Sequence, residues 1–239
     1  MTIAKSISIV NDGVGTAGIT ASSGNGVTIN AGASDSVHLR GLTIEGLHAP
    51  VSNGIKFKTG GNLAIENCVI RDFQNGIDIS PTTSSSFSVS NTIASNNGAD
   101  GIFVGPRGSA VVAGVLSEVT ATNNGDGIFV SGAGTTGASL NVTIVDSVVS
   151  NNPDFGVLSN SITGGHAVTA VLVRTSVASN NGTGLFASNA TLRVAHSVVT
   201  GNNIGVSTPV GGLCCSYGDN DIDGNTNNNT GILITNPTH

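Results

Sequence analysis

The sequence predicts an all-β solenoid, in which one chain of 239 residues winds into about 8–10 coils of about 25 residues. Three observations predict this class. A short phrase of Asn or Asp, then Gly, then an aliphatic residue recurs along most of the chain. A longer phrase of alternating aliphatic and polar residues follows each copy, and an Asn-rich turn closes each unit. No segment shows helical periodicity over the 11–18 residues that identify a helix.

The short phrase is clearest in Asn53–Phe57 and Asp126–Val130. Its glycines are landmarks spaced 21 to 29 residues apart: Gly54, Gly76, Gly101, Gly127, Gly156, Gly184, Gly205 and Gly231. A unit of this length cannot bury its own apolar face, so successive units must stack. Parallel pairing at roughly 4.8 Å would then align the residue after each landmark in one inward column. Its predicted members are Ile55, Ile77, Ile102, Ile128, Val157, Leu185, Val206 and Ile232.

The first coil starts at residues 6–10, which alternate as a strand with one buried face should. The longer phrase is then visible at 63–70 and in five later copies. Each unit ends in a polar corner: Asn96–Asn97, Asn123–Asn124, Asn151–Asn152, Asn180–Asn181 and Asn202–Asn203. Asparagine tolerates left-handed backbone and can hydrogen-bond the copy above, and the landmark glycine is expected to supply positive φ. Residues 1–239 are therefore expected to form one elongated domain.

The composition excludes several classes of protein. Charged residues make up 9% of the chain and the net charge is −6, with no basic stripe of the kind that nucleic-acid binding needs. No segment has the ~20 consecutive apolar residues of a membrane span, and the start lacks the apolar run and cleavage site of a signal peptide. Cys68, Cys214 and Cys215 form neither a disulfide framework nor a CxxC metal motif.

The alternating phrases, the Asn corners and the Gly-aliphatic strand together resemble the right-handed parallel β-helix repeats of the pectate-lyase-like superfamily, over about residues 6–235. The resemblance implies a right-handed coil, as does the general rule for parallel crossovers. It also implies an extracellular, cell-surface or periplasmic location. The superfamily includes lyases, hydrolases, epimerases, phage tailspikes and adhesins. Such coils normally have capped ends, so we expect either a capping segment before this chain or a cap supplied by neighbouring molecules.

An acidic corner is the first candidate site. Asp100 and Asp126 precede landmark glycines in adjacent turns, which places their carboxylates about one strand spacing apart. Asp78 projects outward one turn earlier. Two carboxylates at this separation can share a proton or bind calcium. The pattern thus favours Asp78, Asp100 and Asp126 as catalytic candidates, with Asp100 and Asp126 as candidate calcium ligands.

Superfamily lyases use calcium held by acidic residues together with an arginine base. Lys56 and Arg107 are the cations expected near the acidic corner. The alternative is purely structural, because Asn53 and Asn75 occupy the equivalent position in earlier turns and Asp can replace Asn at a corner.

An outward stripe is the second candidate. The residue two after each landmark should face solvent, and these residues are Lys56, Asp78, Phe103, Phe129, Leu158, Phe186, Ser207 and Leu233. An apolar centre is unusual on an outer face and predicts a binding surface or an interface in a homodimer or homotrimer. The same face forms the substrate groove in much of the superfamily, so a polysaccharide is the other expected partner. A local register that turns these residues inward remains open.

Two further patterns have structural alternatives. Asp219–Gly224 matches the start of a calcium-binding loop, but Thr230 replaces the required Glu, and the segment also aligns with the Asn-rich corners. A polar ladder is expected at equivalent turn positions, either as a cation site or as a hydrogen-bonded turn: Asn67, Asn91, Glu118, Asp146, Thr175 and His196.

No complete catalytic motif is present. Gly165–Ala167 is the nearest fragment to the Gly-His-Gly phrase of polygalacturonase-type hydrolases, and their other phrases are missing. The sequence therefore favours a secreted or surface binding module without catalysis, directed at glycan or at another copy of itself. The alternative is a polysaccharide lyase or glycoside hydrolase that uses the acidic corner, with calcium as its candidate cofactor.

Overall fold

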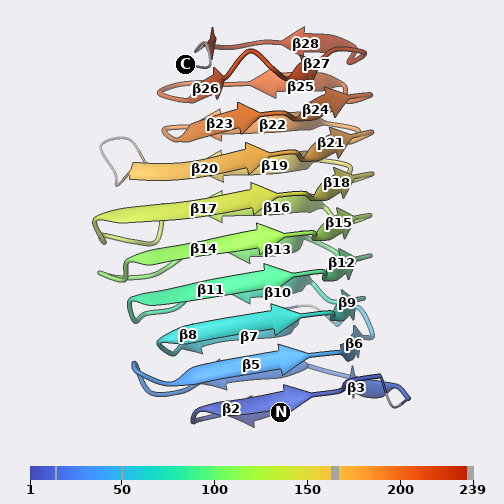
Figure 1. The fold of residues 1–239 in the computed structure, drawn as a ribbon, viewed down its shortest axis with the longest axis vertical. Helices are drawn as coiled ribbons and strands as arrows, with labels where there is room; N and C mark the ends of the chain where they lie inside the picture. The colour runs from blue at the N-terminus through green and yellow to red at the C-terminus, as the bar shows by residue number, and fades with distance from the viewer. Residues whose placement is uncertain (14, 50, 163–166, 236–239) are drawn as a thin grey trace.

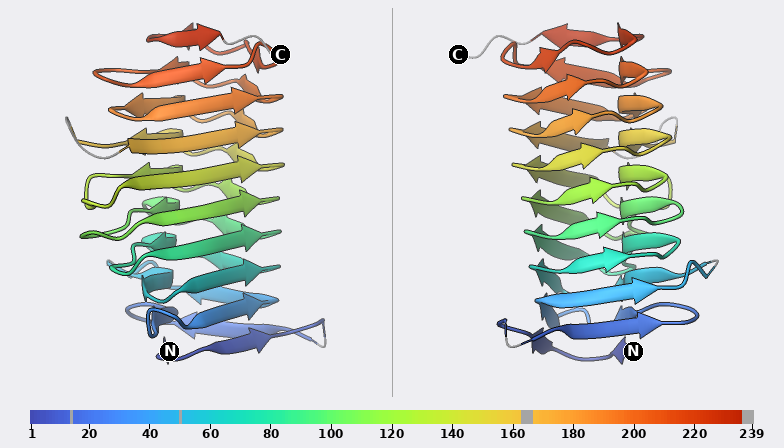
Figure 2. Two further views of the ribbon diagram at one scale, coloured as in Figure 1. Left: turned by 60° about the vertical axis from the view of Figure 1, so that its left-hand side comes forward. Right: turned by 90° about the vertical axis from the view of Figure 1, so that its right-hand side faces the viewer.

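The computed structural model describes residues 1–13, 15–49, 51–162 and 167–235, through which one continuous coil runs (Figure 1). Each turn contributes one strand to each of three parallel sheets, which contain 10, 10 and 9 strands. The strand order within every sheet follows the chain, so the sheets extend side by side along one axis over about nine turns (Figure 2). Every regular element in the described ranges is a strand. The predicted all-β parallel solenoid is confirmed.

Sheet A contains the glycine phrase. Its strands are β1 (Thr2–Ile3), β4 (Val27–Asn30), β7 (Asn53–Thr59), β10 (Asn75–Ile79), β13 (Asp100–Val104), β16 (Asp126–Ser131), β19 (Phe155–Asn160), β22 (Thr183–Ser188), β25 (Ile204–Ser207) and β28 (Asn227–Asn229).

Sheets B and C contain the two halves of the alternating phrase. Sheet B consists of β2 (Ile7–Val10), β5 (Ser36–Arg40), β8 (Asn62–Glu66), β11 (Ser85–Ser90), β14 (Val112–Ser117), β17 (Ser139–Val145), β20 (Ala167–Val173), β23 (Thr191–Ala195), β26 (Leu213–Ser216) and β29 (Leu233–Thr235). Sheet C consists of β3 (Ala17–Ala21), β6 (Leu42–Gly46), β9 (Val69–Arg71), β12 (Ile93–Ser95), β15 (Thr120–Thr122), β18 (Val148–Ser150), β21 (Ser176–Ala178), β24 (Val198–Thr200) and β27 (Asp221–Ile222).

The inward column of sheet A is confirmed from Ile55 to Val206, because each member is the register partner of the next and all are fully buried. Burying one such side chain contributes about 1.5–3 kcal/mol. The last predicted member is wrong: Val206 pairs with Asn229, and Ile232 is 54% exposed. The side chain of Asn225 accepts a hydrogen bond from the backbone amide of Asn202, so Asn225 is the corner residue of the last turn. β28 therefore lies before the Gly231 phrase, and Ile232 falls in the connection to sheet B.

The Asn corners form a buried ladder, as predicted. In each step the side-chain oxygen accepts from the residue one turn earlier: Asn124 Oδ1 accepts from the backbone amide of Asn97 at 3.1 Å and from its Nδ2 at 2.8 Å. The ladder continues through Asn152, Asn180, Asn202 and Asn225. The left-handed backbone belongs to the residue before each of these, as at Asn96, Asn123, Asn151 and Ser179.

The landmark positions require glycine for a different reason from the positive φ that was predicted. None of those from Gly54 to Gly205 has positive φ. A Cβ at Gly101 would instead lie 2.7 Å from Asn124 Nδ2 and 2.7 Å from the Gly127 carbonyl oxygen. Real Cβ atoms do not approach so closely, so glycine is required because the Asn ladder and the next turn occupy that space.

Candidate functional site

The outward face of sheet A presents the predicted stripe. Register pairs link Lys56, Asp78, Phe103, Phe129, Leu158, Phe186 and Ser207 in successive turns. Their neighbours in each strand are the fully buried inward residues, so alternation places the stripe outside and the inward register is excluded. Leu233 does not belong to the stripe, because it lies in sheet B opposite Cys214.

The phenylalanines of this face pack against one another and do not form the freely exposed ridge that was expected. Phe103 and Phe129 meet edge to face with ring centroids 5.2 Å apart, and both are half-buried. Phe186 packs in the same way at 4.9 Å against Phe155, which the sequence reasoning did not single out. Leu158 between them is only 8% exposed. The signal for Phe155 was present, since it stands immediately before a landmark glycine, where earlier turns carry Asp.

The acidic corner lies beside this row, at the start of each strand. Asp100 and Asp126 are register partners, as predicted. They continue a ladder of amide side chains: Asn75 Nδ2 donates to Asn53 Oδ1 at 3.1 Å, and the backbone amide of Asp100 donates to Asn75 Oδ1 at 3.2 Å. Asp126 therefore occupies a position built for Asn, as the structural alternative proposed.

The two carboxyl groups nevertheless differ from ordinary surface acids. Burial, then the charges of Asp126 and Asp78, raises the pKa of Asp100 to about 7. Burial raises the pKa of Asp126 to about 6, against the effect of a hydrogen bond from the Phe155 amide to Asp126 Oδ1 at 3.1 Å. With these pKa values, Asp100 is about half protonated at pH 7, whereas Asp126 is mostly ionised. A partly protonated carboxyl beside a carboxylate can serve general acid–base chemistry.

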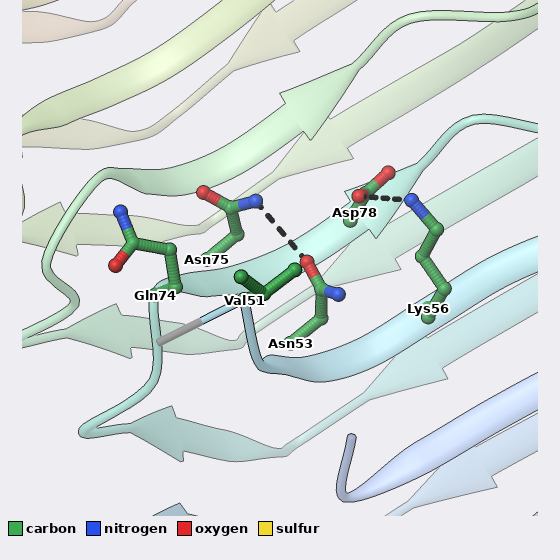
Figure 3. Close-up of a pocket in the computed structure, with 6 residues that line it drawn as sticks. All are labelled: Val51, Asn53, Lys56, Gln74, Asn75 and Asp78. Carbon is green, nitrogen blue, oxygen red and sulfur yellow. Dashed lines mark hydrogen bonds and ion pairs between the residues drawn. The ribbon is translucent and has the colours of Figure 1, made fainter. Parts of the chain in front are cut away.

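A hollow lies at the start of β7 and β10, where Asn53 and Asn75 occupy the position that Asp100 and Asp126 hold in later turns (Figure 3). Lys56 and Asp78 form an ion pair on its floor, and Asp78 is 5% exposed. Only Oδ2 of Asp78 takes part, and Asp78 Oδ1 is buried without a hydrogen-bond partner. The remaining lining residues are Val51, Asn53, Gln74 and Asn75.

Two further hollows adjoin this one. Lys56 also lines a second hollow, which reaches Arg107 at the loop edge of the sheet. Arg107 in turn lines a third hollow beside Phe103 and Phe129. The structure thus brings Lys56, Asp78, Arg107 and the first two phenylalanines into one run of depressions, whereas Asp100 and Asp126 lie on its corner side.

The side chains of the calcium-loop pattern bind neighbouring turns of the coil. Asp219 binds the backbone amide of His196 and Asp223 binds Asn228, so the residues of Asp219–Gly224 point to different neighbours and not to one centre. The prediction that Thr175 belongs to the polar ladder is wrong, because its side chain is buried and it follows the turn position by one residue. Arg174 is the member, because it shares the left-handed backbone of the others.

The His and Cys residues do not converge on a metal centre within the described residues. His38, His48 and His196 each face a different carboxylate, from Glu66, Asp72 and Asp219. All three cysteines are buried, and burial raises the pKa of the Cys214 thiol to about 12, which disfavours the thiolate that binds metal. No group of three or more His, Cys, Asp or Glu side chains in that part of the chain is arranged so that it could hold a metal ion. Gly165 and His166 lie outside the described residues.

Comparison with solved structures supports the fold. The A-module of the mannuronan C-5 epimerase AlgE4 from Azotobacter vinelandii is similar, with a TM-score of 0.56 and 15% identity over 100% of this chain and 84% of that one. At this identity the likeness concerns the fold alone. No curated protein matches the sequence. In the described ranges no helix is long and apolar enough to span a membrane.

A family model described as "Periplasmic copper-binding protein (NosD)" matches residues 6–238. Among the residues that the structure describes, the scattered His and the buried Cys residues do not fit a copper centre. The match extends over nearly the whole chain, and the chain therefore belongs to the NosD family.

Proposed function

We propose that this protein is an extracytoplasmic binding module that holds a polysaccharide along the outward face of sheet A, without catalysing a reaction. The run of adjoining hollows carries the proposal, because Lys56 joins the first to the second and Arg107 joins the second to the third. An elongated depression of this kind suits an extended polymer better than a small molecule. The family's periplasmic description supports the compartment.

The chemistry of the face also suits a sugar chain. Apolar rings at Phe103 and Phe129 can pack against the carbon–hydrogen faces of sugar rings, while polar groups at both sides can bind hydroxyls. The AlgE4 module, of similar fold, is an epimerase of mannuronan. A fold likeness does not transfer that activity, but it supports a β-helix face as a place where a polysaccharide can lie.

The test is a binding assay against neutral and acidic polysaccharides, by calorimetry or affinity electrophoresis. Phe129→Ser is expected to weaken binding by about tenfold, because it removes a ring from the centre of the row. Val115→Ser is the matched control, since Val115 is 41% exposed on sheet B. Absence of binding to every polymer, or equal losses in both variants, would refute the proposal.

A carbohydrate-active enzyme, lyase or hydrolase, is the second candidate. The observation that favours it is the acidic pair, in which the pKa of Asp100 is about 7 and that of Asp126 about 6, with Asp78 near. Calcium bound by Asp100 and Asp126 would be the assisting cofactor. The assay is product formation from each bound polysaccharide, with and without calcium. Turnover that disappears in Asp100→Asn and Asp126→Asn would establish the enzyme over the binder.

Self-association competes with glycan for the same face. A homodimer or homotrimer would bury Phe103, Phe129, Leu158 and Phe186 between copies. We favour glycan because these side chains are already half-buried or buried within one chain, which leaves little apolar area for a second copy. Light scattering decides this point: a dimer or trimer that Phe129→Ser converts to monomer would favour self-association.

A further inference from the structure

The second hollow of this face gathers an unusual share of the chain's positive charge. It is lined by Asn30, Lys56, Lys58, Thr59, Ser80, Thr82 and Arg107. The whole chain has 8 Lys and Arg residues and a net charge of −6, so three of its cations border a single depression. Such a concentration of one charge sign focuses the local potential on ligands of the opposite sign.

A local irregularity of β7 presents one of these cations. Ile29 pairs with Phe57 and Asn30 pairs with Thr59, which leaves Lys58 as an extra residue without a partner on β4. A bulge of this kind redirects a side chain relative to regular alternation, and Lys58 is exposed. The loop that follows β13 supplies Arg107, whose backbone amide donates to the Pro81 carbonyl at 2.9 Å and is thereby fixed over the turn below.

The charges at this hollow are only partly neutralised. Lys56 pairs with Asp78, whereas neither Lys58 nor Arg107 contacts a carboxylate of any described residue. One acid among three cations leaves an excess of positive charge at the rim.

An unpartnered hydroxyl gives an independent indication of a ligand. Ser80 lines the hollow, is 4% exposed, and its Oγ has no hydrogen-bond partner. Buried polar atoms are almost always hydrogen-bonded, and an unmade bond costs about 1–3 kcal/mol. Asp78 Oδ1, two residues earlier on the same outward side of the chain, is likewise buried and unpartnered. Asp78 lines the adjoining first hollow and its carboxylate can only accept hydrogen bonds, so the Ser80 hydroxyl is the unused donor that borders the cations.

We propose that this hollow is the subsite for an anionic substituent, a carboxylate or a sulfate ester, of the polysaccharide. The inference rests on the proposed function and names its ligand class as an acidic polysaccharide. Arg107 binds the anion through its planar guanidinium, Lys58 adds a second charged donor, and the Ser80 hydroxyl donates the remaining hydrogen bond. Lys56 stays paired with Asp78 and keeps that carboxylate from repelling the ligand.

The experiment compares binding to polygalacturonate, dextran sulfate and neutral dextran. Arg107→Ala and Lys58→Ala are each expected to weaken binding to the preferred charged polymer at least about tenfold, and Ser80→Ala less. Arg193→Ala is the control, because it removes the same charge from sheet B. The preferred polymer identifies carboxylate or sulfate. Unchanged affinity in the Arg107 and Lys58 variants, or an equal loss in Arg193→Ala, would overturn the subsite.

Failure of the subsite and of the proposed function are separable. If charged and neutral polymers bind equally, and all variants bind like wild type, the binding module stands and the anionic subsite is refuted. If no polymer binds, free galacturonate and inorganic sulfate are titrated and followed by NMR. Shifts that disappear in Arg107→Ala would keep the anion site and refute the polysaccharide function, and the absence of shifts would refute both.

Discussion

Replacing Asp100 by Asn tests the unusual electrostatics of the acidic corner. The pKa of Asp100 is raised to about 7 in the folded chain, from an ordinary carboxyl value of 3.8. A folded pKa above the unfolded one means that the proton stabilises the folded state. The contribution is therefore fully present below the unfolded pKa and is lost as the pH rises through about 7. Asparagine carries no titrating proton, so the Asp100→Asn variant does not lose this stability as the pH rises.

The magnitude follows from the shift in pKa. Each tenfold change in acidity corresponds to about 1.4 kcal/mol, so the charged Asp100 costs up to roughly 4 kcal/mol of folding free energy near pH 8. Part of the shift comes from the charges of Asp126 and Asp78, and Asp100 retains some contact with solvent, which makes this figure an upper bound. Asn at this position can also continue the amide ladder of Asn53 and Asn75, which adds to the stability of the variant.

Urea unfolding at about pH 5 and about pH 8 measures the effect. Asp100→Asn is expected to be stabilised by a few kcal/mol at the higher pH and by much less at the lower one. Asp221→Asn is the control, because it removes the same charge from an exposed position on β27. Equal pH dependence in wild type and Asp100→Asn, or carboxyl NMR shifts of Asp100 that titrate near 4, would contradict the burial argument.

Two further predictions concern the coil itself. Asn180→Ala should lose about 2–4 kcal/mol in urea unfolding, because the buried backbone amide of Asn152 then loses its acceptor. The same change at the adjacent, exposed Asn181 should cost under about 0.5 kcal/mol, and similar losses at both sites would disprove the role of the ladder. Gly127→Ala should lower the melting temperature, because its Cβ would lie 2.8 Å from Asn152 Nδ2. Gly18→Ala meets nothing nearer than 4.0 Å and should not, so a stable Gly127 variant would refute the steric account.

Most of the fold could be predicted from the sequence, because every turn of the coil follows the same alternation of buried and exposed residues. Alternating residues in each turn must face the same interior, and any register other than turn on turn would expose Ile77, Ile102 and Ile128. The same rule placed Phe103 and Phe129 on the outer face. It failed at the C-terminal turn, because the position of the Asn225 corner, and not the Gly231 phrase, sets the register there.

The candidate site could be predicted only in part. The pairing of Asp100 with Asp126 follows from repeat spacing, and so does the position of Asp78 opposite Lys56. The charge state of Asp100 does not follow from repeat spacing, since its pKa depends on how deeply the corner is buried.

The sequence by itself determined which residues share a column, because period-two alternation and a repeat of about 25 residues leave one way to bury the aliphatic positions. Only the tertiary structure decided what surrounds each column. The bulge at Lys58, the loop that carries Arg107 and the unpartnered hydroxyl of Ser80 come from different turns, and no repeat relates them. Their meeting depends on the path of the connections between sheets, where spacing and composition are irregular, and that path places the proposed anion site on the face.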